Sequence, residues 1–100
     1  MITHIVMFKL KNFESEDIKN QKLAELKKVI DDLKNKISVL KHIEAGINIS
    51  TREVAFDAVL VSEFENNEDL QTYLVHPEHV KLADFLKDIR DKVAVVDYIK

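Results

Sequence analysis

Three side chains that can move protons lie close together in the sequence: Tyr73, His76 and His79, at spacings of three residues. Histidine titrates near neutral pH and can accept or donate a proton, and a tyrosine hydroxyl can polarise or protonate a developing enolate. If helical phase continues through this segment, the spacing places the three groups on one side of the chain. The pattern therefore indicates acid–base chemistry, with His79 as base and Tyr73 as acid or oxyanion donor.

A structural interpretation of the same residues stays open. Pro77 cannot continue a preceding helix and suits the first turn of a new one. His76 would then cap the helix that begins at Pro77, and Tyr73 and His79 would be hydrogen-bonded structural residues.

Two further histidines lie on expected strands. His4 shares an alternating row with Val6 and Phe8, so its side chain points either into a barrel or toward the helices. His42 opens a later strand beside Lys41, and we expect it to be exposed.

The composition excludes several other kinds of chemistry. Without cysteine there is no thiolate nucleophile, and with one glycine and one proline there is no glycine-rich phosphate loop. None of the serines lies in a nucleophile elbow. A transition-metal site is not expected either, because no third ligand is clearly placed beside His76-x-x-His79.

Charge and hydropathy predict a globular chain without nucleic-acid or membrane partners. The 15 basic and 18 acidic residues leave a net charge of −3, whereas nucleic-acid binders show a basic excess. The longest apolar runs span four residues, and the first residues lack the basic region of a signal peptide. We expect one domain, residues 1–100, and a cytoplasmic location.

The first half of the chain predicts a strand, a long helix and a second strand. Residues 2–10 are rich in β-branched and aromatic side chains, and Ser15 is a candidate helix N-cap. Apolar residues at spacings of three and four then predict about five helical turns: Leu23, Leu26, Ile30, Leu33, Ile37 and Leu40. A coiled coil is the alternative, although the seam covers fewer than three heptads. Residues 41–49 alternate as a strand, with Ile43, Ala45, Ile47 and Ile49 on one face.

The second half predicts a strand over 56–64, a short helix capped by Asn66 or Asn67, a new helix from Pro77 and a last strand over 93–99. The order β-α-β-β-α-β, with right-handed crossovers, gives an α+β ferredoxin-like plait: a four-stranded antiparallel sheet with the helices on one face.

The face of the sheet without helices is expected to be buried as well. In the strands over 2–10 and 56–64, apolar side chains point both ways, whereas a sheet with one solvated face alternates apolar and polar residues. The expected cover is a second copy of the chain, packed sheet to sheet in a homodimer. A monomer with a partly solvated sheet is the alternative.

Several segments together resemble one family. The opening THIVMFKLK, the lone Gly46 in AGINIS, DAVLVSEF, EDLQTYLVHPEH and the closing VVDYIK are similar to the stress-responsive α/β-barrel (Dabb) family. The resemblance implies a ferredoxin-like monomer whose sheet pairs with a partner's to close a dimeric α/β barrel. The family includes stress-associated proteins of unassigned activity and a cyclase that closes a polyketide ring without a cofactor.

The resemblance also implies roles for individual residues. Tyr73 and His79 match the acid–base tyrosine and histidine of the cyclase, and His4 matches one of its pocket histidines. Ala58 stands where the cyclase has another pocket histidine. The residues expected to contact a substrate are His4, Val6, Phe8, Leu60, His76 and Phe85.

Some relatives hold a hard cation through main-chain carbonyls where the first helix ends, and the matching carbonyls here are those of Lys34, Ile37 and Leu40. Apart from a structural Mg²⁺ at that place, no cofactor is expected.

The sequence thus predicts a homodimer that binds a small apolar, aromatic or polyketide-like molecule and carries out cofactor-free cyclase, lyase or isomerase chemistry. The alternative is a non-catalytic, stress-associated binding or assembly protein.

Overall fold

Four strands and three α-helices follow one another in a computed structural model of the chain, which describes all 100 residues. In chain order the elements are β1 (Ile2–Leu10), α1 (Glu16–Asp32), the short 3-10 helix η1 (Leu33–Asn35), β2 (His42–Ile47), β3 (Ala58–Phe64), α2 (Asn67–Val75), α3 (Pro77–Ile89) and β4 (Arg90–Ile99). None of the three α-helices combines the length and the apolar character needed to cross a bilayer.

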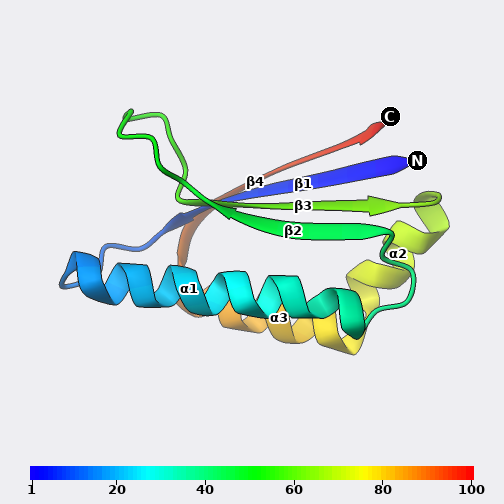
Figure 1. The fold of residues 1–100 in the computed structure, drawn as a ribbon, viewed down its shortest axis with the longest axis horizontal. Helices are drawn as coiled ribbons and strands as arrows, with labels where there is room; N and C mark the ends of the chain where they lie inside the picture. Colours follow the sequence, from blue (N-terminus) through cyan, green and yellow to red (C-terminus); the bar gives the residue numbers. More distant parts are fainter.

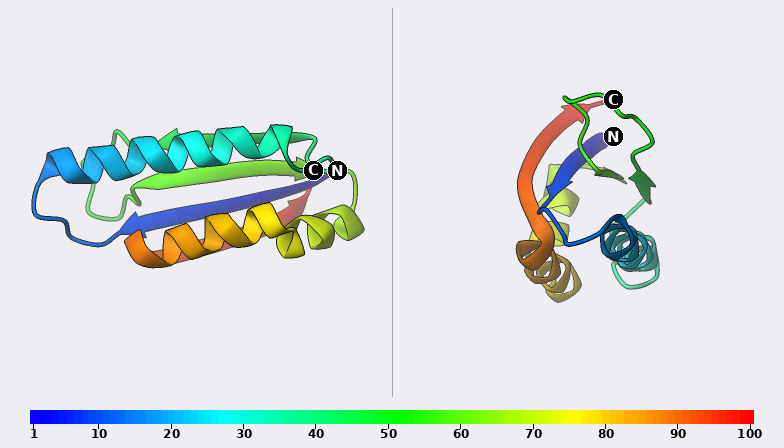
Figure 2. Two further views of the ribbon diagram at one scale, coloured as in Figure 1. Left: turned by 90° about the horizontal axis from the view of Figure 1, so that it is seen from below. Right: turned by 90° about the vertical axis from the view of Figure 1, so that its left-hand side faces the viewer.

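The strands form one antiparallel sheet in the order β2-β3-β1-β4. All helices lie on one side of this sheet, with α1 along the β2 side and α3 along the β4 side (Figures 1 and 2). This is the ferredoxin-like fold expected from the order of the elements, with the two helical crossovers packed on the same face.

The strand register decides which way His4 points. His4 lies opposite Ser62 on β3 and Asp97 on β4, and Val6 and Phe8 continue the same row. Val6 and Phe8 are buried in the core beneath the helices. Because side chains alternate along a strand, His4 faces the helices as they do, and not the open face of the sheet.

The core begins on α1, where Leu23, Leu26 and Ile30 are buried. The predicted five-turn helix is too long: α1 ends at Asp32, and Ile37 and Leu40 lie in the turn that follows η1. Both side chains are nevertheless only 1% exposed. The spacing of Ile37 and Leu40 correctly indicated that both side chains are buried. It did not indicate a helix, because the turn after η1 buries them equally well.

Three strand boundaries also differ from the prediction. β2 ends at Ile47, whose side chain is exposed, and Ile49 lies in the loop with 98% of its surface exposed. β3 begins at Ala58 instead of residue 56, and β4 begins directly after α3 at Arg90 instead of residue 93.

Ser15 and Asn66 are the N-caps of α1 and α2, as expected from the sequence. The Ser15 hydroxyl accepts a hydrogen bond from the backbone N–H of Ile18 at 3.2 Å, and the Asn66 side chain accepts one from Asp69 at 2.9 Å. These bonds satisfy amide groups that the first helical turn leaves unpaired.

The face of the sheet without helices is apolar and partly open to solvent. Met7 is 40% exposed, Val96 52% and Tyr98 45%. The loop between β2 and β3 rises on this side, opposite the helices (Figure 1). Between that loop and the sheet lies a cavity of about 360 Å³, whose apolar lining includes Met7, Phe56 and Val59.

Candidate functional site

The fold brings three of the predicted site residues into one cluster. Tyr73 comes from α2, His79 from α3 and His4 from β1. The ring centres of Tyr73 and His79 are 4.6 Å apart, and those of His4 and Tyr73 are 6.2 Å apart. The helical break at Pro77 therefore leaves Tyr73 and His79 in contact, and pairing of β1 at the centre of the sheet adds His4.

Tyr73 lies at the middle of this cluster. Its side chain is fully buried, and its hydroxyl has no hydrogen-bond partner. Burial raises the pKa of Tyr73 well above its usual range, so the phenol stays protonated at neutral pH. A buried hydroxyl without a partner costs about 1–3 kcal/mol, and a ligand that supplies an acceptor removes that cost.

A hydrogen bond to the last turn of α2 holds His79 in one tautomer. Its Nδ1–H donates to the carbonyl oxygen of Leu74 at 3.0 Å, which leaves the Nε2 lone pair available as a base. Burial lowers the pKa of His79; the Leu74 hydrogen bond raises it and the charge that His4 can carry lowers it further. His79 is therefore neutral at pH 7.

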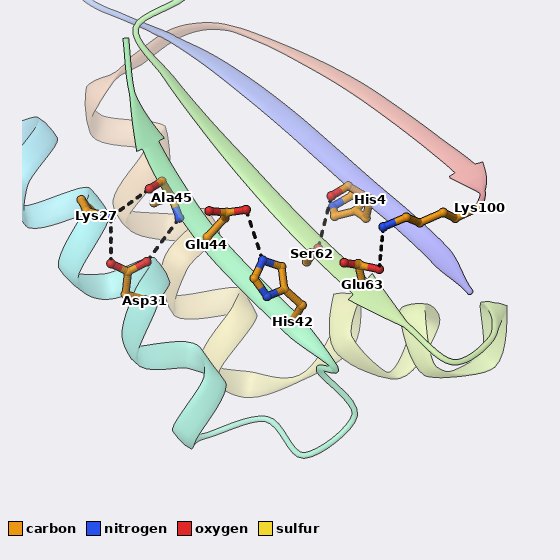
Figure 3. Close-up of polar contacts among 9 residues, drawn as sticks. All are labelled: His4, Lys27, Asp31, His42, Glu44, Ala45, Ser62, Glu63 and Lys100. Carbon is orange, nitrogen blue, oxygen red and sulfur yellow. Dashed lines mark hydrogen bonds and ion pairs between the residues drawn. The ribbon is translucent and has the colours of Figure 1, made fainter. Parts of the chain in front are cut away.

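His4 has a carboxylate partner that the sequence analysis did not identify. Its Nδ1–H donates to the side chain of Asp97 on β4. Its own backbone carbonyl accepts from the Ser62 hydroxyl at 3.3 Å, as Figure 3 shows. The His4 side chain is 7% exposed, whereas the Asp97 side chain is 44% exposed. Only the register of two strands that are far apart in sequence reveals this pair.

His76 has a different place in the fold. Its Nδ1 accepts a hydrogen bond from the backbone N–H of Glu78 at 3.1 Å, so His76 is the N-cap of α3. This is the capping role of the structural interpretation.

The remaining residues predicted to contact a substrate divide into two groups. Val6, Phe8 and Leu60 are at most 9% exposed and belong to the core. Phe85 instead lines a groove of about 300 Å³ between α1 and α3, together with Lys28 and Glu78 among others. None of the five surface cavities is lined by Tyr73, His79 or His4.

The side chains of this chain do not assemble a group that could hold a metal ion. No three His, Cys, Asp or Glu side chains come together in a suitable cluster. At the turn after α1, the Leu40 carbonyl oxygen accepts a hydrogen bond from the ammonium group of Lys34 at 2.8 Å.

Together, these features define a small ferredoxin-like α+β domain with an open apolar sheet face and a buried cluster of tyrosine and histidines. The chain belongs to the Stress responsive A/B Barrel Domain (Dabb) family, whose sequence model matches residues 2–100.

Two curated proteins illustrate the range of its relatives. A stress-response A/B barrel domain-containing protein of Arabidopsis thaliana is 32% identical over 101 residues, which cover 99% of this chain and 47% of that protein. The chain thus spans about half the length of that relative. Olivetolic acid cyclase of Cannabis sativa is 25% identical over 99 residues, which cover 97% of this chain and 94% of the cyclase.

Among solved structures, a dimeric ferredoxin-like protein of unknown function from Bacteroides fragilis is 36% identical. The match covers 99% of this chain and 95% of the other chain, with a TM-score of 0.90. This relative shares the whole fold, and it is a dimer.

Proposed function

We propose that this chain forms a homodimer that binds a small, largely apolar carbonyl compound at Tyr73 and His79 and catalyses cofactor-free proton transfer on it. The observation that carries the proposal is the Tyr73 hydroxyl, which is buried without a partner while His4 and His79 flank its ring. Buried polar groups are nearly always hydrogen-bonded, and exceptions concentrate where a ligand or a reaction supplies the partner.

The protonation states fit an acid–base pair. The neutral Tyr73 phenol donates a hydrogen bond to a substrate carbonyl oxygen, and the Nε2 lone pair of His79 accepts a proton from the adjacent carbon. The electron pair of the broken C–H bond moves into an enolate, whose oxygen Tyr73 stabilises. Returning the proton from His79 to a different atom of the enolate completes an isomerisation. In a ring closure, the enolate carbon attacks a second carbonyl, and protonated His79 gives its proton to the resulting alkoxide.

Asp97 has a supporting role in this proposal. Because it accepts the Nδ1–H of His4, it fixes the tautomer of that ring and presents the Nε2 lone pair on the other side. His4 then contacts the ligand as a hydrogen-bond acceptor, and Asp97 acts as a positioning residue.

A ligand would reach the cluster from the β4 side. The row of β4 that faces the helices contains Val93, Val95 and Asp97, opposite Phe8, Val6 and His4 respectively. All three β4 residues are exposed, although their neighbours on β1 are buried. Since no cavity reaches Tyr73 in this closed form, binding requires side chains on this side to move apart.

The homodimer is supported by the open apolar face and by relatives. Met7, Val96 and Tyr98 lie on the face without helices and are 40–52% exposed. Contiguous apolar surface of this kind marks association sites, and the Bacteroides fragilis relative is dimeric.

The non-catalytic alternative is favoured by one observation, namely that Tyr73 is fully buried and no cavity touches it. Under that alternative, the cluster packs the core and the sheet surface binds other molecules or a second copy.

Thermal-shift binding measurements distinguish the two functions. The probes are olivetolic acid, the compound in the name of the cyclase relative, and an aromatic β-keto ester, tested on the wild type, Tyr73→Phe and Thr3→Val. Thr3→Val is the matched control, because the Thr3 hydroxyl is also buried without a partner but lies on the other face of β1. We expect a probe to raise the Tm of the wild type and of Thr3→Val by more than that of Tyr73→Phe. If no probe shifts the wild type, or all three proteins shift equally, the binding proposal fails and the non-catalytic function stands.

A further inference from the structure

The turn after α1 lies at the negative end of the helix dipole. α1 ends at Asp32, η1 continues to Asn35, and the chain then turns toward β2. The last carbonyls of a helix have no partner within it, and they attract cations. The family resemblance places a Mg²⁺ ion here, held by the carbonyls of Lys34, Ile37 and Leu40.

In this chain a side chain already supplies the positive charge. The ammonium group of Lys34 donates to the Leu40 carbonyl oxygen at 2.8 Å. Lys34 forms no ion pair with a carboxylate, whereas the nearby Lys36 pairs with Asp32 at 3.3 Å and with Glu78 at 4.0 Å. The charge of Lys34 is therefore directed at the backbone of the turn.

While the Lys34 ammonium group occupies the Leu40 carbonyl, the residues around the turn do not fit a divalent metal. Mg²⁺ prefers octahedral oxygen ligands and is usually held by one or two carboxylates. The segment 33–41, LKNKISVLK, contains three lysines and no acidic residue. In addition, the Ile37 carbonyl accepts a hydrogen bond from the backbone N–H of Leu40 at 3.3 Å. Two of the three expected carbonyl ligands thus already have donors.

We propose that the Lys34 ammonium group takes the place of a divalent cation at this turn. The chain carries its own cation, six residues before the carbonyl that it binds, and the fold needs no metal ion there. Burial of Ile37 and Leu40 at 1% exposure each makes the geometry of this turn matter for the core.

The test compares Lys34→Met with Lys41→Met by thermal unfolding in millimolar MgCl₂ and in NaCl of equal ionic strength. Both variants lose one positive charge from the same segment, but the Lys41 side chain forms no hydrogen bond or ion pair. We expect Lys34→Met to lower Tm by about 4–8 °C more than Lys41→Met, because a carbonyl loses a charged donor. The wild type should show no response specific to Mg²⁺, and Mg²⁺ should restore part of the Tm that Lys34→Met loses.

Three results would overturn the proposal. The wild type could be stabilised by Mg²⁺ beyond the NaCl control, which would show that a metal binds beside Lys34. Lys34→Met could be as stable as Lys41→Met, so that the ammonium group contributes nothing. Lys34→Met could also lose Tm without any recovery in Mg²⁺, in which case the turn is not a cation site. None of these readouts depends on ligand binding at Tyr73.

Discussion

Tyr73 and Thr3 carry the two side-chain hydroxyls of this chain that are buried without a hydrogen-bond partner. They differ in their surroundings, since the Tyr73 ring contacts the rings of two histidines and Phe64. Thr3 lies on the opposite face of β1 from His4. The proposed reaction site rests on this unsatisfied hydroxyl beside groups that can transfer protons.

Removing the Tyr73 hydroxyl should not destabilise the unliganded chain. Tyr73→Phe deletes a buried polar group that has no partner, so we expect the free energy of unfolding to stay constant or to rise by up to about 1–3 kcal/mol. Urea denaturation of the wild type, Tyr73→Phe and Thr3→Val measures this. A loss of more than about 1 kcal/mol in Tyr73→Phe would show that the hydroxyl is bonded in the free protein, and would favour a structural role.

His79 should make stability depend on pH in a defined direction. Its pKa in the folded chain lies below the usual 6.5, so between these two values the unfolded chain binds more protons than the folded one. Stability is therefore complete above pH 6.5 and is lost as the pH falls below it, with a slope of at most about 1.4 kcal/mol per pH unit from one group.

The contribution of His79 can be isolated by substitution. We expect His79→Gln to flatten the loss of unfolding free energy below pH 6.5, and His42→Gln, which changes an exposed histidine, to leave it as in the wild type. Denaturation in urea at a series of pH values is the measurement. The same slope in the wild type and His79→Gln would show that His79 does not cause the acid sensitivity.

At the level of secondary-structure elements, helix α1 protects the β2 edge of the sheet. On the edge strand β2, the Ala45 carbonyl accepts from Lys27 at 2.9 Å and the Ala45 N–H donates to Asp31 at 3.2 Å. Lys27 and Asp31 also pair with each other at 3.1 Å, and Figure 3 shows both reaching from α1 to the strand. Unpaired edge groups invite another strand, so α1 closes β2 to strand addition.

Removing the side chains that cover the β2 edge should cause self-association before it causes unfolding. We expect the double variant Lys27→Ala/Asp31→Ala to lose about 1–2 kcal/mol of stability and to form larger species on concentration. Light scattering over a concentration series is the measurement. The matched control is Lys22→Ala/Glu25→Ala, which removes another ion pair of α1 that does not touch the sheet. Equal scattering by both double variants would mean that the contacts at Ala45 do not protect the edge.

The same elements show what a single sequence can and cannot predict. The starts of α1 and α2 were predicted because a cap is a local signal: Ser15 and Asn66 bond to amides three residues away. The end of α1 was not, because Ile37 and Leu40 are buried in a turn and keep the helical spacing. Periodicity records which residues are buried, and the backbone shape that buries them is decided by the rest of the fold.

In the candidate site, likewise, the contact between residues close in sequence was predictable and the contact that depends on strand register was not. Contact between Tyr73 and His79 follows from their short separation in sequence. The pair of His4 and Asp97 joins residues at opposite ends of the chain and depends on the register of β1 with β4. Phe85, expected beside a ligand, instead lines the groove between α1 and α3, and its own sequence neighbours do not reveal that placement.

At the level of the whole molecule, we propose a separate role for each face of the sheet. The face beneath the helices contains the core and the cluster of Tyr73, His4 and His79. The opposite face is apolar around Met7 and is uncovered in a single chain. A ligand site on one face and association on the other can therefore be tested independently.

A charge at the centre of the uncovered face should separate the proposed dimer. Met7 lies on the central strand β1 with 40% of its surface exposed, so Met7→Asp places a carboxylate where a second sheet would pack. We expect the wild type to sediment at about twice the chain mass of 11.6 kDa and Met7→Asp to sediment as a monomer. The control is Val29→Asp on α1, which is similarly exposed at 37% but lies on the helical side, and which should remain dimeric. If Met7→Asp keeps the mass of the wild type while Val29→Asp becomes monomeric, the copies associate through their helices, and the apolar face needs another explanation.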